Sequence, residues 1–458
     1  MRGRWVLCGM VALGVFAMNV CTSLAAEARS GPLTLEQCIE IGLKKNAQIL
    51  TARQQLDRSK AEALAAWSDV LPKMSTSVIG FNAVKQGLYV RQDQVQRLEE
   101  GRTVFVDTLL TRRPYSRYTY SLSFSASQNL YDGGRTVSTI RRAKESRKSA
   151  EFNLRGKRQH VVFSVKQVYY TLLKAEKLVT VLKEAVKASE QRLETIQSLR
   201  DAGSGTEADV LRARVALGHD RVNLVAAEND VLLAKSELND ILGLDVNAPI
   251  EVMDVPVSEP RIPDVEEAIR TAKTRNPDLR RLGSEAKVAD HSIGVARSAY
   301  FPQIGVQVAY SRYGEELSRV YQDYDKNYGI SLNTSLSYNL FDGFLKRANL
   351  ARARTSYFVA KEMLAQKERE IVLAVKRALL NLEMYREILR ISGESVASAR
   401  EDLRYAKELY RVGSGTLLEL IDAQVGLTRA QVDRVRAQYD GKIAEAQLAY
   451  AMGLPLDE

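Results

Sequence analysis

The residues that could perform chemistry are few and lie far apart in the chain. His160, His219 and His291 are scattered, and none of them stands in the HExxH pattern of a metal site. The sequence also lacks paired CxxC motifs, a phosphate-binding Walker loop and the GxSxG turn that presents a nucleophilic serine. We therefore predict that the protein is not an enzyme, holds no metal and needs no cofactor.

One pair of acidic residues has a suggestive spacing. Glu419 and Asp422 are three residues apart, so they share one face of a helix. Two solvated acids beside a turn are common, and the sequence alone favours that interpretation. Carboxylates crowded around a narrow opening would instead repel one another, raise one another's pKa and favour cations. The elements that position the pair decide between these two interpretations.

The N-terminus predicts export from the cytoplasm. Two arginines precede an apolar run and then small residues, which is typical of a secretory signal peptide over 1–26, cut after Ala25 or Ala26. Cys21 is disfavoured as a lipidated first residue, because the preceding MNV lacks the small residue usually found there. Cys38 is then the remaining cysteine, which excludes an intrachain disulfide.

Bulk composition narrows the class further. The chain has 458 residues, 27% charged and 45% apolar, which exceeds one ordinary core and is not a disordered composition. The net charge of +10 falls to +8 without Arg2 and Arg4, and the basic residues are interspersed with acids. We interpret them as solvated helix faces, not as a nucleic-acid surface. No run of eighteen apolar residues follows the signal, so a membrane crossing would require strands closed into a barrel.

The chain is an internal duplication. Three pairs of matching segments lie 210 residues apart: NLYDGGR at 129–135 with NLFDGFL at 339–345, GSGT at 203–206 with GSGT at 413–416, and ILGL at 241–244 with AMGL at 451–454. Upstream landmarks such as Pro72 and Pro302 lie 230 apart. The first copy therefore carries 20 extra residues, which we place in a polar loop at 85–116. The two repeats are 27–250 and 251–458.

Each repeat is predicted to contain the same elements in the same order. Short helices near 34–44 and 264–275 open the repeats. The first repeat then has helices at about 46–70, 134–200 and 207–242 and strands at about 74–84 and 117–130. The second has helices at about 276–300, 345–410 and 417–452 and strands at about 303–313 and 329–340. Apolar residues every seven positions along the long helices predict coiled-coil-like packing, and each such helix would span roughly 100 Å.

The strands alternate between an apolar and a polar face. From Tyr118 to Leu130, aromatic and aliphatic residues alternate with serine, threonine and asparagine, and 328–340 has the same pattern. The strand near Val78 is less regular, and we place Ile79, Phe81 and Ala83 together on its apolar face. A soluble sheet packed on a core is the simpler alternative. It would need another apolar layer to cover these faces, but the apolar residues of the helices are already used in packing the helices together. Such strands fit a transmembrane barrel around water. Four strands are too few to close one, so the protein must oligomerise.

The whole mature chain, about 34–454, resembles the TolC family of outer-membrane efflux and secretion channels. The resemblance rests on the order of short motifs, each occurring twice: LPKM and FPQI, YDGG and FDGF, and GSGT with DVLRA and GSGTLLELIDA. It implies a mainly α protein with a membrane β-barrel: a homotrimer whose 12-stranded outer-membrane barrel is continued by a 12-helix α-barrel in the periplasm. The short helices and the linker near 244–262 would form an equatorial belt.

The resemblance also implies roles for residues at the periplasmic tip. Glu419 and Asp422 match the acidic pair of the pore constriction, and Asp209 and Tyr410 match a closed-state latch. The turns would contact an adaptor protein, through the residues Gly203, Ser204, Gly205, Thr206, Gly413, Ser414, Gly415 and Thr416. Gly415 departs from the family, because a well-studied member has a clasping arginine there. Arg411 and Arg212 are candidates to replace it.

The predicted function is a passive trimeric exit duct in outer-membrane lipid. It would serve a tripartite efflux pump or a type I secretion system, and open at its periplasmic tip on engagement by an adaptor (membrane fusion) protein and an inner-membrane RND or ABC transporter. The alternative is a periplasmic adaptor or a coiled-coil scaffold protein.

Overall fold

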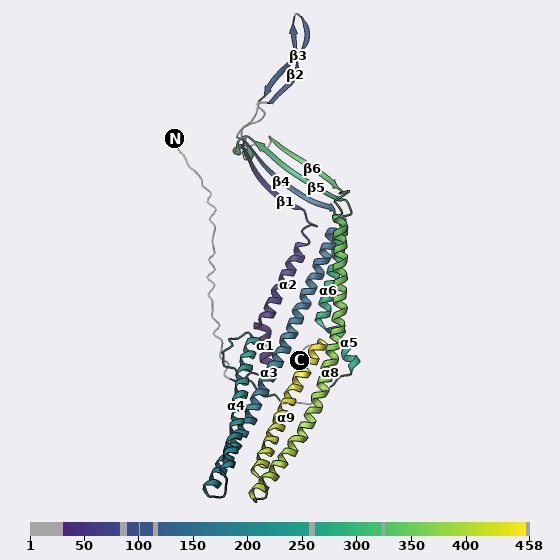
Figure 1. The fold of residues 1–458 in the computed structure, drawn as a ribbon. Coiled ribbons are helices and arrows are strands. Elements are labelled where there is room, and N and C mark those ends of the chain that lie inside the picture. Colours follow the sequence, from purple (N-terminus) through teal and green to yellow (C-terminus); the bar gives the residue numbers. More distant parts are fainter. Residues whose placement is uncertain are drawn as a thin grey trace, which may run out of the picture.

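The computed structural model describes residues 31–82, 89–99, 101–112, 118–255, 262–322 and 326–454, so the predicted signal peptide lies outside the described residues. The molecule is elongated. Its β-strands lie towards one end, helices follow them, and two helical hairpins form the other end (Figure 1). None of the described helices combines the length and apolar character that a membrane crossing requires.

The two repeats run through matching elements. The first contains α1 (Leu35–Lys45), α2 (Ala47–Ala65), β1 (Lys73–Asn82), β2 (Tyr89–Glu99), β3 (Arg102–Arg112), β4 (Tyr118–Tyr131), α3 (Arg135–Asp201) and α4 (Glu207–Leu242). The second contains α5 (Val265–Arg275), α6 (Pro277–Ser298), β5 (Gln303–Gly314), α7 (Leu317–Gln322), β6 (Tyr328–Ser337), α8 (Leu345–Arg411) and α9 (Leu417–Met452). Both long helices, α3 and α8, begin and end within one residue of their predicted bounds.

The loop predicted at 85–116 is wrong for most of its length. Strands β2 and β3 pair antiparallel from Tyr89–Arg112 to Glu99–Arg102, around a turn where Gly101 has a φ of +77°. Polar residues stand at both odd and even positions of the β2 sequence, so no period-two apolar pattern marks this strand. The short helix α7 between β5 and β6 was likewise not predicted.

The main sheet joins the two repeats. Its order is β1-β4-β5-β6, and every neighbouring pair is antiparallel, so β4 and β5 form the contact between repeats. Directly paired residues share a face. The chain of partners Phe124, Tyr310 and Ile330 therefore lies on the apolar face. The other face carries hydroxyl pairs, with Ser75 and Ser125 oxygens 2.9 Å apart.

The register corrects the predicted face of β1. Ile79 lies opposite Ser121 and Phe81 opposite Thr119, so both lie on the serine-rich face. Val78, opposite Leu122, lies on the apolar face instead. The apolar residues of β1 do not keep to alternate positions of the strand. Their faces are therefore known only from the pairing with β4. Ala83 lies outside the described residues.

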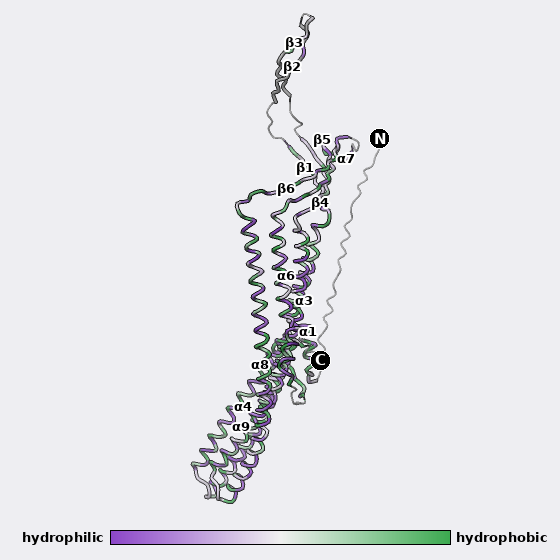
Figure 2. The backbone as a smooth tube through the Cα atoms, turned by 90° about the vertical axis from the view of Figure 1, so that its right-hand side faces the viewer, coloured by the Kyte–Doolittle hydropathy of each residue, from purple (hydrophilic) through white to green (hydrophobic). Residues whose placement is uncertain are grey.

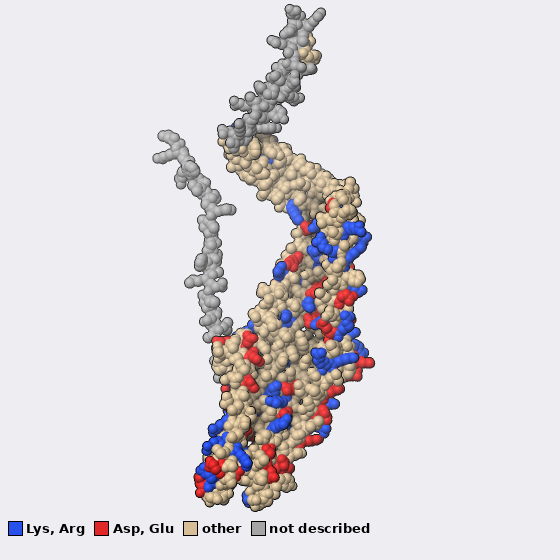
Figure 3. All heavy atoms as spheres, viewed as in Figure 1, with Lys and Arg blue, Asp and Glu red and all other residues tan. Residues whose placement is uncertain are grey.

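Of the described helices, the short α7 contacts β4 and β5 near Gly314, and the apolar face along β6 stays uncovered. The side chains of Ile330, Leu332 and Leu336 are 70%, 69% and 70% exposed. The visible face of the sheet carries few charged side chains, whereas the helices below carry many of both signs (Figure 3). The sheet therefore exposes an extensive apolar surface, which is rare on a monomeric soluble protein.

Aspartates make the switch from strand to long helix. The Asp132 carboxylate accepts hydrogen bonds from the backbone N–H groups of Gly134 (3.1 Å) and Thr136 (2.7 Å), and Asp342 accepts one from Lys346 (3.0 Å). These bonds satisfy N–H groups that the first turn of a helix leaves free. Gly133 has a φ of +68° and fits closely against the end of α6.

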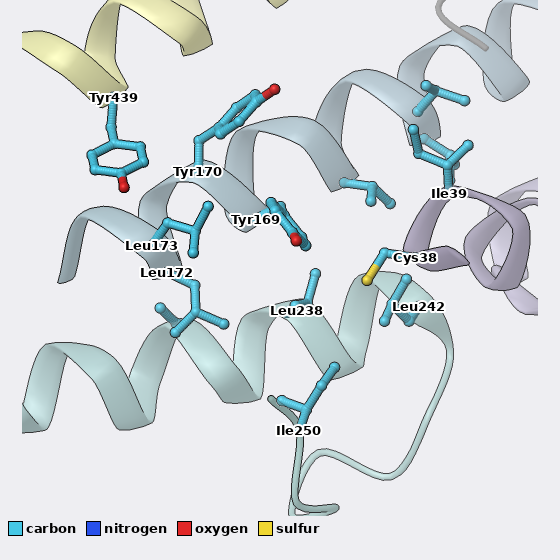
Figure 4. Close-up of a cluster of buried hydrophobic side chains, with 14 of the residues drawn as sticks. Cys38, Ile39, Tyr169, Tyr170, Leu172, Leu173, Leu238, Leu242, Ile250 and Tyr439 are labelled. Atoms are coloured by element: carbon cyan, nitrogen blue, oxygen red, sulfur yellow. The ribbon is translucent and has the colours of Figure 1, made fainter. Parts of the chain in front are cut away.

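A belt at mid-height anchors the helices. The segment before α1 pairs with the linker after α4, through Leu33 N–H to Glu251 O (2.8 Å) and Met253 N–H to Leu33 O (3.0 Å). The hydroxyl of Tyr169 on α3 reaches Met253 O at 2.5 Å. Figure 4 shows this tyrosine pointing into a cluster of apolar side chains that includes Cys38. The belt thus ties the segment before α1 and the linker between the repeats to α3.

Below the belt the helices pair into two hairpins, α3 with α4 and α8 with α9. Seen from the side, both hairpins bend away from the line of the upper helices (Figure 2). An ion pair links the hairpins at the belt, where Lys174 on α3 contacts Asp440 on α9 at 2.7 Å. Lys177 binds Asp254 at 2.6 Å and thereby lowers the pKa of that carboxyl group.

Gly133 gives a test of the strand-to-helix switch. A Cβ at this position would lie 2.6 Å from Ser298 O and 2.8 Å from Phe301 Cβ. We expect Gly133→Ala to cost clearly more than the ~1–2 kcal/mol of a left-handed non-glycine residue. Gly134→Ala is the matched control, because φ is +83° there but a Cβ would meet nothing within 4 Å. Thermal unfolding in detergent measures both; equal losses would contradict the packing argument.

Candidate functional site at the hairpin tips

The two GSGT turns adopt the same closed geometry. Gly203 and Gly413 have φ values of +81° and +78°, which favour glycine. In the second turn, the N–H groups of Ser414 and Gly415 both donate to Leu409 O at 3.0 Å. A Cβ at Gly415 would lie only 3.0 Å from Leu409 Cβ. The tight closure therefore favours glycine at the position where the family resemblance implied an arginine.

The predicted adaptor-contacting residues lie at the far end of the molecule from the sheet (Figure 1). Ser204 and Ser414 are exposed, as are the first glycines of both turns, while Gly205 and Gly415 are partly covered. Thr206 and Thr416 cap α4 and α9, because their hydroxyls accept from the N–H groups of Asp209 and Glu419. The turns thus present small side chains at a rigid, capped end.

Glu419 has a local partner that the sequence reasoning missed. Its carboxylate accepts from Thr416 N–H at 2.8 Å, which completes a capping box with the Thr416 hydroxyl. The T-x-x-E spacing is the sequence signal for this motif. Asp422 follows one turn later, and both acids are exposed in the single chain. The structure therefore places the acidic pair side by side on the accessible surface of α9.

Asp209 and Tyr410 come close together from different hairpins. Burial raises the pKa of the Tyr410 hydroxyl, and the nearby Asp209 carboxylate raises it further. Among the described residues, however, the hydrogen bonds to Asp209 come from Thr206 Oγ1 (2.6 Å) and Arg212 (3.5 Å) rather than from Tyr410. The Tyr410 ring instead packs between the apolar clusters of both hairpins.

The candidate replacements for the clasping arginine do not cross between hairpins. Arg411 pairs with Glu408 on its own helix at 3.0 Å, and Arg212 pairs with Asp209 at 3.5 Å. An arginine does close the first turn: Arg200 contacts Asp201 at 2.6 Å and Glu207 at 3.1 Å. In each of these pairs at least one partner is well exposed to solvent, so each pair stabilises its turn only modestly.

A cavity of about 610 Å³ separates α4 from α9 just above the tips. Leu211, Val215 and Val425 line its walls, and Arg192 and Asp220 lie at its α3 and α4 side. The Asp220 carboxylate accepts a 2.5 Å hydrogen bond from the Ser189 hydroxyl, and burial lowers the pKa of Arg192. Within the described chain, no group of three or more acidic, histidine or cysteine side chains could hold a metal ion.

Solved structures identify the fold as that of an outer-membrane channel. The chain superimposes on CusC with a TM-score of 0.78 at 19% identity, covering 92% of each chain. It superimposes on the Neisseria gonorrhoeae MtrE outer membrane channel, in its open state, with a TM-score of 0.75 at 19% identity, covering 92% of this chain and 89% of MtrE. These likenesses confirm the predicted fold class, an α-barrel continuing a β-barrel.

The chain belongs to the outer membrane efflux protein family, whose model matches residues 39–244 and 268–454. It is 24% identical over 433 residues to the probable efflux pump outer membrane protein TtgC of Pseudomonas putida, covering 92% of this chain and 82% of TtgC. It is 26% identical over 305 residues to protein CyaE of Bordetella pertussis, covering 66% of this chain and 64% of CyaE.

The family is one of channel proteins rather than enzymes, and its members lie in the outer membrane. The prediction of an outer-membrane efflux channel is therefore confirmed. The alternative, a periplasmic adaptor or a scaffold protein, finds no support in these similarities.

The capping box at the second turn yields a direct test. Thr416→Ala removes the hydroxyl that accepts from Glu419 N–H, and we expect a loss of about 1 kcal/mol of local stability. Hydrogen exchange at the amides of 417–420 measures the loss. Thr416→Ser is the control, because serine caps equally well. Unchanged exchange in Thr416→Ala would show that the cap contributes nothing here.

Proposed function

We propose that three copies of the chain form a continuous duct, which exports cargo without performing chemistry on it. Each copy supplies four strands to a 12-stranded barrel in outer-membrane lipid and four helical columns to a 12-helix periplasmic tunnel. The duct serves a tripartite efflux pump or a type I secretion system. The similarity to TtgC of Pseudomonas putida, a probable efflux pump outer membrane protein, supports the first of these assignments.

The observation that carries this proposal is the unfinished sheet. Among the residues that the structure describes, β1 and β6 each pair along one edge only. Unpaired strand edges are costly in a bilayer, where no water satisfies the backbone. Pairing β6 of one copy with β1 of the next completes both edges in a closed ring. The apolar face with Leu332 then contacts lipid, and the serine face with Ser125 lines a wet interior.

The duplication suggests how neighbouring copies interlock. Gly133 fits against Ser298 and Phe301 of the other repeat. The 230-residue offset makes Ser68 and Leu71 the counterparts of that pair, at the opposite edge of the chain. In a closed ring they would lie against Gly343 of the next copy. The space around Gly343 in the single chain, where a Cβ would meet nothing within 4 Å, is consistent with this arrangement.

Gly343→Ala tests the interlocking. We expect it to weaken trimers, because the added methyl group would collide with the neighbouring copy as it would at Gly133 within the chain. Gly134→Ala is the control, since its counterpart in the second repeat is Phe344 and a side chain is already accommodated there. Native electrophoresis or mass photometry in detergent measures the trimer fraction. Trimers of Gly343→Ala as stable as those of the unmodified protein would refute the contact.

The tip is the proposed entrance. Two carboxylates from each of three chains, Glu419 and Asp422, would form the pore constriction, and Asp209 with Tyr410 would act as a closed-state latch. The GSGT turns would receive the hairpins of a periplasmic adaptor, which couples the duct to an inner-membrane RND or ABC transporter. Small, exposed side chains at both turns support such close helical contact.

Charge at the constriction can be separated from helix capping. Glu419→Gln keeps a residue that can complete the capping box, and Asp422→Asn keeps the size of its side chain. We expect the double variant to lose most of its block by multivalent cations in planar bilayers, because the crowded carboxylates that attract cations are gone. Its thermal stability should stay close to that of the unmodified protein.

Glu419→Ala alone is the capping control, and it should lower local stability by about 1 kcal/mol while leaving Asp422 to bind cations. A double variant whose conductance and cation block equal those of the unmodified protein would show that the acidic pair does not line the pore.

A further inference from the structure

The second hairpin inserts a leucine into the first. Leu417 is the first residue of α9 and is only 5% exposed. The other buried side chains of its cluster are Ile196 of α3 and Val210 and Ala213 of α4. We call these three residues the Leu417 seat. The leucine is therefore buried chiefly by the neighbouring hairpin, not by its own.

The duplication shows that this insertion is specific to the second hairpin. The residue 210 positions before Leu417 is Glu207, and the one before Tyr410 is Arg200. In the first turn these two form an ion pair at 3.1 Å and close their own turn. In the second turn the equivalent residues are apolar and aromatic, and both pack against the seat. The two equivalent positions thus stabilise the first turn by an internal ion pair, whereas in the second turn they attach the hairpin to the first hairpin.

The attachment at the tips is separate from the ion pair of Lys174 and Asp440 that joins the hairpins at the belt. Just above the seat, α4 and α9 separate around the 610 Å³ cavity. The wall residues Val215 and Val425 are 61% and 54% exposed, so they do not pack together across it. The seat is therefore a small apolar contact below an open space, and the two hairpins can separate there without disrupting a continuous interface.

We propose that Leu417 in its seat holds the second hairpin against the first in the closed entrance, and leaves the seat when the entrance opens. This proposal rests on the proposed function, because it takes the tips as the entrance of the duct. An apolar contact of this kind is not screened by salt, unlike the exposed ion pairs around it. The seat therefore holds the hairpins together at ionic strengths that weaken those pairs.

The test compares two leucines of α9. Leu417→Ala removes the side chain from the seat. Leu420→Ala is the matched control, because Leu420 is also buried (7% exposed) but packs within its own hairpin, against Val396 and Leu403. Leu417→Met preserves the volume and should fill the seat. All three are purified as full-length trimers, and their conductance is recorded in planar bilayers at low and high salt.

We expect Leu417→Ala to raise the open probability on the order of tenfold, which is within the range that loss of a buried leucine can produce. The increase should be similar at both salt concentrations. Leu417→Met and Leu420→Ala should remain within about twofold of the unmodified protein, since neither empties the seat. An unchanged open probability in Leu417→Ala, or an equal increase in Leu420→Ala, overturns the proposal.

A second measurement does not depend on conduction. Nitroxide labels on Ser204→Cys and Ser414→Cys report the separation of the two tips, with labelled chains diluted into unlabelled trimers. Cys38 can stay in place, because it is fully buried and burial raises the pKa of its thiol to about 12. We expect Leu417→Ala to broaden the distance distribution and Leu420→Ala to leave it narrow.

The two readouts separate the seat from the proposed function. A broadened distribution in a trimer that conducts no ions shows that Leu417 holds the tips together, but it refutes the duct and with it the role of the seat in opening an entrance. Unchanged distances and conductance in Leu417→Ala refute the seat. If Glu419→Gln with Asp422→Asn still relieves cation block in that case, the duct stands without the seat.

Discussion

The hydrogen-bonding edges of the four-stranded sheet constrain the whole molecule. A sheet of four strands satisfies its interior backbone groups, but in the described part of the chain it leaves one edge unpaired on β1 and one on β6. Its apolar face, with side chains such as Leu336 about 70% exposed, adds a second unmet requirement. When identical copies close a barrel in lipid, the strand edges pair and the apolar face is covered at the same time. The helices follow from this, because each strand continues into a helical column through a proline or Asp-Gly switch, so a closed ring of strands places the columns in a ring as well.

Duplication sets the symmetry of that ring, and divergence between the repeats breaks it where function requires asymmetry. At the switch from strand to long helix the repeats remain equivalent: Asp132 and Asp342 accept hydrogen bonds from the first turns of α3 and α8 in the same way. At the tip they differ, because the Arg200–Glu207 pair of the first turn is replaced by an aromatic and an apolar residue. If both turns carried the internal ion pair, this apolar contact between the two hairpins would be absent. The substitution of an internal ion pair by an outward apolar side chain gives the second hairpin a docking point on the first.

The sequence was sufficient to predict the long elements whose ends are marked by glycine, proline or aspartate. Seven-residue apolar periodicity and glycine turns located α3 and α8 to within one residue. The segment 85–116 was not recognised as a strand pair, because polar residues on both faces conceal the period of two. Ile79 and Phe81 were assigned to the wrong face, since the register of an irregular strand depends on its partner. The capping role of Glu419 had a signal in the T-x-x-E spacing. The burial of Leu417 had none, because helical periodicity places residues on a face but does not say which hairpin that face meets.

The distribution of packing along the molecule bears on how it could open. The belt joins α1, α3, α4 and α9 in one extensive cluster around Tyr169 and Leu238, both fully buried, and the linker is hydrogen-bonded to it. The contact between the tips consists of one inserted leucine and a few neighbours. Emptying a buried leucine site costs about 2–5 kcal/mol, an amount that contact with an adaptor could offset, whereas separating the belt would expose many such side chains. Because the strong contacts lie at mid-height and the weak one at the end, the hairpins can move at their tips while the belt keeps the upper helices in place.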